Sequence, residues 1–329
     1  MTGKEHINEY FNGRPFMILC ALALMLAAAV AWSLGATPPI DEASGIFFSL
    51  EGSLLGHSAL SCAINVLCLL ATGGIMLALN KVFSYVRTVT HLPASAFFLL
   101  QLANPSGLVA FNSGTLLSLV TAIAAMPLFA SYQDRHSQRS IFLIFALVAA
   151  GSMFHYGFLV LIPAFLLGFL NMGVFNLKGV LAMLFGLITP FWIVMGLGIA
   201  SPANFAPPHI HGIWSLPMQA LSSPLFILAT LTAVLGVVLA AMNLMTIMKY
   251  RMQTRVYNTF FVFVLIAAVI ALIIDYSDVA VFLPLLNLMV AVQVAHAHTL
   301  NITNLHRYLF ILLLVVGSMA FCAANILLP

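Results

Sequence analysis

Long apolar runs without a charge are the feature that most limits how this chain can fold. Residues 260–274 and 309–321 contain no charged side chain, and similar runs recur along the chain. Of the 329 residues only 6% are charged, whereas a soluble domain has roughly 25%. Only helices and closed barrels satisfy their backbone polar groups in hydrocarbon. Barrel strands alternate apolar and polar residues and these runs do not, so the sequence predicts an all-α, polytopic transmembrane helix bundle.

The number of spans follows from length, because a helix needs about 20 residues to cross the hydrocarbon core. Residues 92–131 and 140–173 are each too long for one span, and turn-forming residues break both, at Asn104 and Pro105 in the first and at Gly151 in the second. Each is therefore expected to form a hairpin with a short first arm. About eleven spans are expected, near residues 16–34, 58–80, 90–103, 112–131, 140–153, 157–173, 179–199, 222–248, 257–275, 278–298 and 308–328.

The basic residues test this layout, because cytoplasmic loops are enriched in Lys and Arg. With the N-terminus inside, all 11 Lys and Arg residues fall on the cytoplasmic side. Merging either hairpin into one span would scatter them over both sides. The opposite side has no basic residue and holds the acids Asp41, Glu42, Glu51, Asp275 and Asp278. We therefore expect a single integral domain over residues 1–329 of a bacterial inner (cytoplasmic) membrane, with the C-terminus outside.

The first external segment carries the most suggestive candidates for chemistry. Asp41 and Glu42 follow two prolines just beyond the first predicted span. A carboxylate at the membrane surface can act as a general base, or as a ligand for a cation that binds pyrophosphate. Polytopic glycosyltransferases that use lipid-linked sugars typically have an acidic residue in this position. The alternative is an ordinary solvated loop, in which surface acids are common.

A second candidate is the pair His209 and His211, in a proline-rich external loop. Two histidines could chelate a metal, with Asp275, Asp278 or the Asp41 and Glu42 pair supplying further ligands. Without an obvious third ligand, a plain loop is the competing interpretation. The cofactor, if there is one, would be a divalent cation.

The interior of the predicted spans is polar only through amides, such as Asn65, Gln101, Asn243, Asn287 and Gln293. Isolated amides in a span favour hydrogen bonds between helices. Ion-coupled transporters usually keep ionisable groups in the membrane, and no predicted span has one at its centre. Nucleotide-, flavin- and nucleic-acid-binding motifs are absent from the sequence.

Five short segments carry a resemblance to a known family. They are Leu-Asn at 79–80, Leu-Pro-Ala at 92–94, Phe-His-Tyr at 154–156, Gly-Leu-Ile-Thr-Pro at 186–190 and Phe-Leu-Pro-Leu at 282–285. In this order, over most of the chain, they resemble a family of Bacteroidota multipass inner-membrane proteins that is a domain of unknown function. The resemblance implies a multipass membrane fold and no established activity.

The leading functional hypothesis is a membrane-embedded transferase that acts on a lipid-linked envelope glycan at the periplasmic face, with Asp41 or Glu42 as base or cation ligand. Its weakness is the lack of an external Arg or Lys to bind pyrophosphate. One rival is a non-enzymatic scaffold or accessory subunit that binds other envelope membrane proteins, and another is a transporter or flippase. A hydrophilic cleft would favour the transferase, an apolar groove in a packed bundle the scaffold, and a central cavity the transporter. Membrane lipids are the expected partners and nucleic acid is not.

The topology gives the first testable prediction. Cysteines placed at positions 107 and 211 should react with an impermeant thiol reagent in intact spheroplasts, because both loops are expected outside. A cysteine at position 136 should react only after lysis, with the parent chain measuring the background from its own four cysteines. Protection at 107 and 211 together with labelling at 136 would invert the topology.

Overall fold

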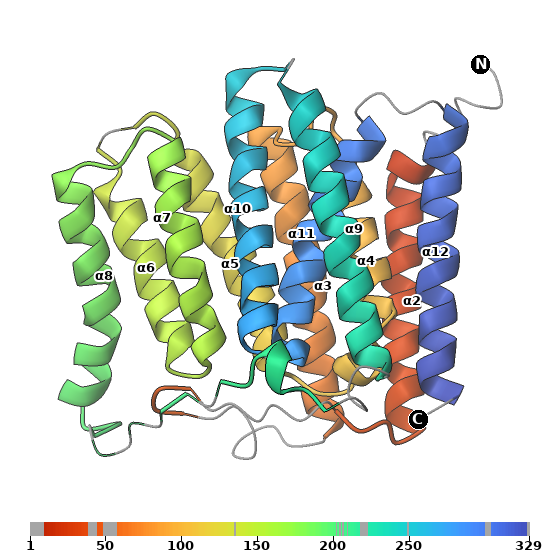
Figure 1. Ribbon diagram of the computed structural model, residues 1–329, viewed down its shortest axis with the longest axis horizontal. Helices are drawn as coiled ribbons and strands as arrows, with labels where there is room; N and C mark the ends of the chain where they lie inside the picture. Colours follow the sequence, from red (N-terminus) through yellow and green to blue (C-terminus); the bar gives the residue numbers. More distant parts are fainter. Residues whose placement is uncertain are drawn as a thin grey trace.

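The computed structural model describes residues 10–38, 45–48, 58–134, 136–201, 203, 205, 207, 208, 210–217, 223–248, 250–299 and 304–327, with the backbone alone for 304–308 and 327. In this part of the chain, helices stand side by side in one bundle (Figure 1). They are α2 (Arg14–Ser33), α3 (Ala59–Phe83), α4 (Leu92–Leu102), α5 (Ser113–Ala130), α6 (Gln138–Ser152), α7 (Leu161–Asn171), α8 (Leu177–Gly196), α9 (Pro224–Ile247), α10 (Met252–Ile274), α11 (Val279–Thr299) and α12 (Asn304–Leu327). Short 3-10 turns are η1 (Ser106–Leu108), η2 (Tyr156–Val160) and η4 (Ile213–Ser215).

Four of the described helices begin after a side chain that binds a free backbone N–H. Asn112 precedes α5, and its Oδ1 accepts a hydrogen bond of 2.8 Å from the backbone nitrogen of Thr115. Such caps satisfy donors that have no partner within the first turn of a helix. The same kind of cap is made by Ser58 before α3, Asn176 before α8 and Ser223 before α9.

Eight of the described helices are long and apolar enough to cross a membrane. Three further apolar helices are shorter, namely α4, α6 and the continuous unit of η2 and α7. They belong to the two predicted hairpins, whose breaks fall where expected: α4 ends at Leu102, before Asn104, and α6 ends at Ser152, before His155. For the described residues, the prediction of an all-helical bundle with several apolar helices long enough to span a membrane is therefore confirmed.

Helix α11 occupies the centre of the bundle. Its span is entirely buried, and it contacts α4, α5, α9 and α10. Amides join it to two of these neighbours: Asn243 Nδ2 on α9 donates to the side-chain and backbone oxygens of Gln293 at 2.9 and 2.8 Å. Gln293 Nε2 in turn donates to Asn258 Oδ1 on α10 at 3.1 Å.

A second amide contact fixes the other half of α11. Asn287 Nδ2 donates to Gln101 Oε1 and to the backbone oxygen of Leu100 on α4, both at 3.3 Å. On α3, Asn65 Nδ2 donates to the carbonyls of Gly107 and Leu108 at 3.0 and 3.1 Å. The prediction that the interior amides bind neighbouring segments is therefore confirmed.

The two ends of the bundle differ in charge. One end, at the top of Figure 1, carries the connections 84–91, 131–137, 172–176 and 248–251, and we call it the basic end. The other, at the bottom, carries residues 103–112, 153–155, 197–201 and 275–278, and we call it the acidic end. The described Lys and Arg residues lie in or within a few residues of the basic end, whereas Asp275 and Asp278 lie at the acidic end.

The acidic end contains a contact that leaves no room for a side chain. A Cβ added at Gly114, in the first turn of α5, would lie 2.6 Å from the backbone oxygen of Val281 and 2.9 Å from that of Ala280 on α11. Backbone atoms inside a packed bundle cannot move aside cheaply, since interiors are close-packed.

Gly107 is crowded as well, because its Cβ would lie 2.5 Å from the Asn104 amide nitrogen. Position 211, which is exposed, is therefore the better labelling site.

The close approach of α5 to α11 predicts a stability loss. Gly114→Ala should destabilise the protein by about 1–3 kcal/mol, the usual cost of overpacking. The matched control is Gly74→Ala in α3, where an added Cβ meets nothing within 4 Å. Apparent melting temperatures in detergent provide the measurement. Equal melting temperatures for the two variants would show that α5 does not approach α11 this closely.

Candidate functional site

The turn between α6 and η2 carries a histidine that is fully buried. The ring of His155 folds back on its own turn, so that Nδ1 accepts a hydrogen bond of 2.9 Å from the backbone nitrogen of Gly157. A ring nitrogen that accepts an N–H bond has no proton, so the neutral ring must carry its proton on Nε2. His155 is 0% exposed. Its turn thus presents one N–H donor in a fixed direction.

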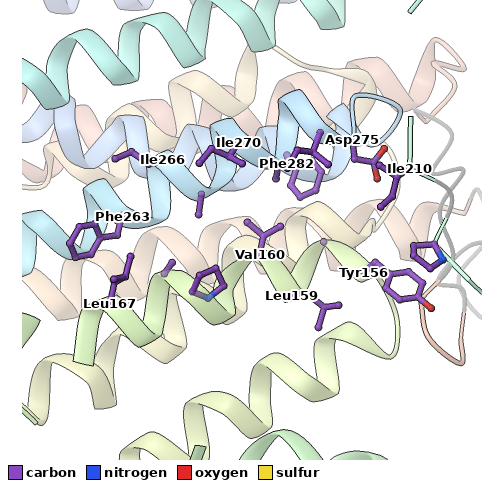
Figure 2. Close-up of a pocket in the computed structure, with 17 residues that line it drawn as sticks. Tyr156, Leu159, Val160, Leu167, Ile210, Phe263, Ile266, Ile270, Asp275 and Phe282 are labelled. Carbon is purple, nitrogen blue, oxygen red and sulfur yellow. The ribbon is translucent and has the colours of Figure 1, made fainter. Parts of the chain in front are cut away.

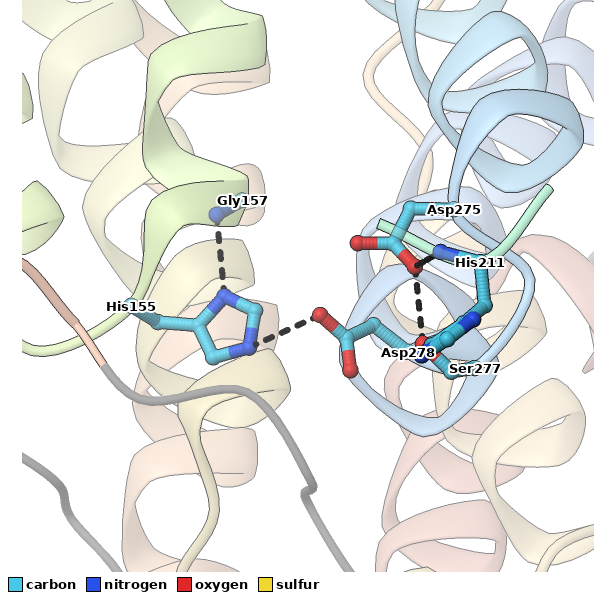
Figure 3. Close-up of polar contacts among 6 residues, drawn as sticks. All are labelled: His155, Gly157, His211, Asp275, Ser277 and Asp278. Carbon is cyan, nitrogen blue, oxygen red and sulfur yellow. Dashed lines mark hydrogen bonds and ion pairs between the residues drawn. The ribbon is translucent and has the colours of Figure 1, made fainter. Parts of the chain in front are cut away.

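That donor faces a buried carboxylate. Asp278 directly precedes α11, and its Oδ2 lies 3.3 Å from His155 Nε2 (Figure 3). Its side chain is 1% exposed. The backbone oxygen of Asp278 accepts hydrogen bonds from Val281 and Phe282 in the first turn of α11. The N-terminus of a helix favours a negative charge, so this is a site where a buried carboxylate can persist.

A second carboxyl group lies three residues earlier, directly after α10. Asp275 Oδ1 accepts hydrogen bonds from Ser277 Oγ at 2.8 Å and from the backbone nitrogen of His211 at 3.3 Å. The backbone oxygen of His211 accepts from the nitrogen of Tyr276 at 2.7 Å, so the loop between α8 and α9 is attached at this point. Burial raises the pKa of Asp275, and the nearby charge of Asp278 raises it further, while the bonds from Ser277 and His211 oppose the change.

An apolar groove of about 610 Å³ ends at Asp275. One wall is a face of α10, where Phe263, Ile266, Ile270 and Ile274 recur at the spacing of a single helix face. The opposite wall comes from η2 and α7, and Ile210, in the loop before α9, lies at the end of the groove beside Asp275 (Figure 2). From Phe263 to Asp275 the groove runs roughly 18 Å, at about 1.5 Å per helical residue.

The groove is open toward the acidic end because α7 and α10 are packed closely farther along. A Cβ at Gly168 would lie 2.8 Å from the Phe260 ring, so the two helices are in direct contact there. Nearer the acidic end the facing residues on α10 include Ala267 and Ala271, which are too small to fill the gap. Figure 2 shows Tyr156 at the mouth of the groove, with its hydroxyl directed away from the apolar walls.

The residues proposed from the sequence fare differently. Asp41, Glu42 and His209 lie outside the described residues, so their assignments stay predictions. His211 does contact Asp275 as anticipated, but through its backbone nitrogen, and its side chain is exposed. In the part of the chain that the structure describes, no three His, Cys, Asp or Glu side chains are grouped to hold a metal ion.

The contact between His155 and Asp278 was missed by sequence reasoning. The two residues are separated by 123 positions, and no motif links them. The bond from Gly157 shows that His155 also shapes its own turn. The useful signal was the position of both residues in predicted external connections. The described part of the connection between α2 and α3 also lies here, since the nitrogens of Phe47 and Phe48 donate to the backbone oxygen of Met153.

Comparisons with family models, curated proteins and solved structures find no match for this chain. Function must therefore be inferred from the groove and from the two carboxyl groups and histidine at its end.

The coupling of Asp275 to Asp278 predicts how stability depends on pH. A raised pKa means that the folded protein binds this proton more tightly than the unfolded chain. The stabilising contribution of Asp275 is then complete below its ordinary pKa of 3.8 and is lost as pH rises through the raised value. The measurement is the difference in apparent melting temperature, parent minus Asp275→Asn, in detergent from about pH 4 to pH 8. This difference should fall as pH rises and then level off.

A second variant tests the cause of this dependence. Asp278→Asn removes the neighbouring charge but keeps an oxygen that can accept from His155. In that background the fall caused by Asp275 should still begin near its ordinary pKa of 3.8, but it should be smaller and should end at a lower pH. A difference that does not change with pH in either background would contradict the coupling.

Proposed function

We propose that this is an inner-membrane protein of eleven spans, with its N-terminus and basic end in the cytoplasm and its acidic end outside. The separation of charge supports this orientation, because Lys and Arg are retained on the cytoplasmic side. In this view the short helices α4, α6 and α7 also cross the membrane, tilted or partly inserted. Membership in the Bacteroidota family that the sequence resembles is part of the same proposal.

The groove is proposed to hold the hydrocarbon chain of one lipid. Its length of roughly 18 Å is close to one leaflet, half of a hydrocarbon core about 30 Å thick. The groove starts at Asp275, at the acidic end, so the lipid would come from the outer leaflet with its head group beside that carboxyl group. A chain that is apolar along its length and polar at one end matches walls with this distribution.

The activity proposed for this site is group transfer to or from a lipid-linked envelope glycan. The observation that carries it is a carboxyl group with a raised pKa at the polar end of an apolar groove. Such a group is suited to general-base catalysis, since an effective base has a pKa nearer the working pH. Asp275 would take the proton of an acceptor hydroxyl. The oxygen would bond to the transferred group as the bond to its carrier breaks, and the carrier would leave with that electron pair.

The other polar residues have supporting roles in this proposal. The contact between His155 and Asp278 joins the η2 wall to the start of α11, and the charge of Asp278 raises the pKa of Asp275. We treat both as positioning residues. Asp41 and Glu42 remain candidates for the base or for binding a divalent cation, because their segment continues into residues 45–48, which lie against the turn before His155.

The scaffold is the second candidate, and the apolar groove in a packed bundle favours it by the criterion stated from the sequence, because such a groove could take a helix of a partner protein. The two candidates differ at the acidic end: a partner helix needs only apolar walls, whereas group transfer needs the carboxyl groups. The transporter is less well supported, since α11 fills the centre of the bundle and is buried along its whole span.

Substitutions at the base test the transferase. Asp275→Asn keeps the shape and removes the base, so the rate should fall by about 10²–10⁴-fold. In a deletion strain, this variant should leave the envelope-glycan defect uncorrected while its expression stays near that of the parent. If Asp275→Asn, Asp278→Asn, Asp41→Asn and Glu42→Gln all complement fully, the transferase is wrong and the scaffold becomes the first choice.

A filled groove tests lipid binding separately. Ala267→Phe should remove the lipid that native mass spectrometry detects on the purified protein, because the ring would occupy the groove. Ile273→Phe is the matched control, since Ile273 is 44% exposed on α10 and does not line the groove. Equal lipid content in the two variants would contradict a lipid in the groove.

A further inference from the structure

We infer that the lipid taken by this groove has an uncharged, hydroxyl-bearing head group, as in a glycolipid whose sugar is joined to its chain without a phosphate. This rests on the proposed function and names the class of lipid. The observations that carry it are the charges around the end of the groove and the hydrogen-bonding capacity of its polar atoms.

The acidic end offers no cation to a phosphate. The connections 34–58, 103–112, 153–156, 197–223 and 275–278 contain no Lys or Arg in the sequence. Phosphate recognition in proteins rests on Arg and Lys, which form charge-assisted hydrogen bonds with its oxygens. A phosphate beside Asp275 would instead lie next to one carboxyl group, with the carboxylate of Asp278 close behind it.

A bridging metal ion does not remove this difficulty in the described part of the chain. A divalent cation would need several oxygen ligands, and no group of three His, Cys, Asp or Glu side chains is arranged for one there. The imidazole of His155 is also committed, because Nδ1 accepts from Gly157 and Nε2 faces Asp278.

Hydroxyl groups, by contrast, match the polar atoms at the mouth. An ionised carboxyl group only accepts hydrogen bonds, and each of its oxygens has two lone pairs. Asp275 Oδ1 already accepts from Ser277 and His211, and Figure 3 shows the second oxygen of Asp275 directed away from both. A sugar hydroxyl can donate to that oxygen without adding charge to a half-buried site.

A cationic head group would also be attracted to a carboxylate, but the geometry favours the neutral one. Asp278 is buried behind the groove and already faces an N–H donor, so Asp275 alone lines the mouth. Two hydrogen bonds to Asp275 Oδ1 disperse part of its charge. The site therefore suits a head group that donates hydrogen bonds from hydroxyl groups better than one that carries a positive charge.

Photo-crosslinking can test this choice on the purified full chain in phosphatidylcholine nanodiscs. The probes are glucosyl diacylglycerol, phosphatidylglycerol and a cationic diacyl trimethylammonium lipid, all with the same chains and a diazirine near the chain end. Peptide mass spectrometry locates the cross-links on α10 and α7. We expect glucosyl diacylglycerol to label the groove about tenfold more than phosphatidylglycerol, because like charges repel at short range. The preference should be the same with EDTA and with Mg²⁺.

Variants separate failure of this inference from failure of the proposed function. Asp275→Asn should raise labelling by phosphatidylglycerol toward that of the glycolipid, and Asp275→Lys should reverse the preference. Ala267→Phe should abolish labelling by every probe. Groove labelling that is equal for the probes, stronger for the cationic lipid, or reversed by Mg²⁺ would overturn the head-group inference while leaving a lipid in the groove. Absence of groove labelling by all three would overturn the lipid site itself.

Discussion

The hydrocarbon core of a membrane offers no hydrogen-bond partner, and the arrangement of this bundle depends on that constraint. An unpaired polar group costs several kcal/mol there, so each must be satisfied within the protein. Helix α11 meets this condition only in part: Gln293 is bonded to α9 and α10 and the Asn287 amide nitrogen to α4, whereas Asn287 Oδ1 is buried without a hydrogen-bond partner among the described residues. Threonine hydroxyls in the spans bind the carbonyl four residues earlier, as Thr121 binds Leu117. Polar groups that could do chemistry are thereby confined to the ends.

At the acidic end the same constraint explains why the carboxyl groups lie where they do. Asp275 and Asp278 stand between two helices, where backbone N–H groups, a serine and a histidine can reach them. The groove begins beside them because η2 replaces the first turns of a full-length helix and because small residues line α10. A longer α7 with large side chains opposite it would have closed the space. The apolar walls and the polar end therefore arise from one local feature, a shortened helix after a buried turn.

Much of the fold could be predicted from the sequence, because helix ends depend on local chemistry. The breaks at Asn104 and Gly151 and the cap at Asn112 are visible in the chain itself. The positions of the Lys and Arg residues then predict which connections lie at the same end of the bundle, without any knowledge of packing. The sequence predicts that the interior amides bind other helices, but not which helices. Gln293 needs a partner in hydrocarbon, and nothing local shows that its partners lie on α9 and α10.

The candidate site was less predictable, because it is made by packing. His155 and Asp278 are far apart in sequence, and their contact follows from the way α6, α7 and α11 pack together. The groove is equally invisible beforehand, since Ala267 and Ala271 are ordinary residues for a membrane helix. His211 is a different case. The sequence suggests a metal site that its imidazole shares with Asp275, whereas in the structure the His211 backbone binds Asp275 and the imidazole is exposed.

The position of α11 links the interior of the bundle to this site. Asp278 directly precedes α11, whose apolar span is entirely buried, so the carboxylate facing His155 is held beside a helix of the bundle's interior. The opposite wall, η2 and α7, is attached to it through that same histidine. Asp275 stands between them and also holds the loop between α8 and α9 at His211 through its Oδ1. A head group at the mouth therefore meets a carboxyl group whose surroundings are fixed by the core on one side and by a loop on the other.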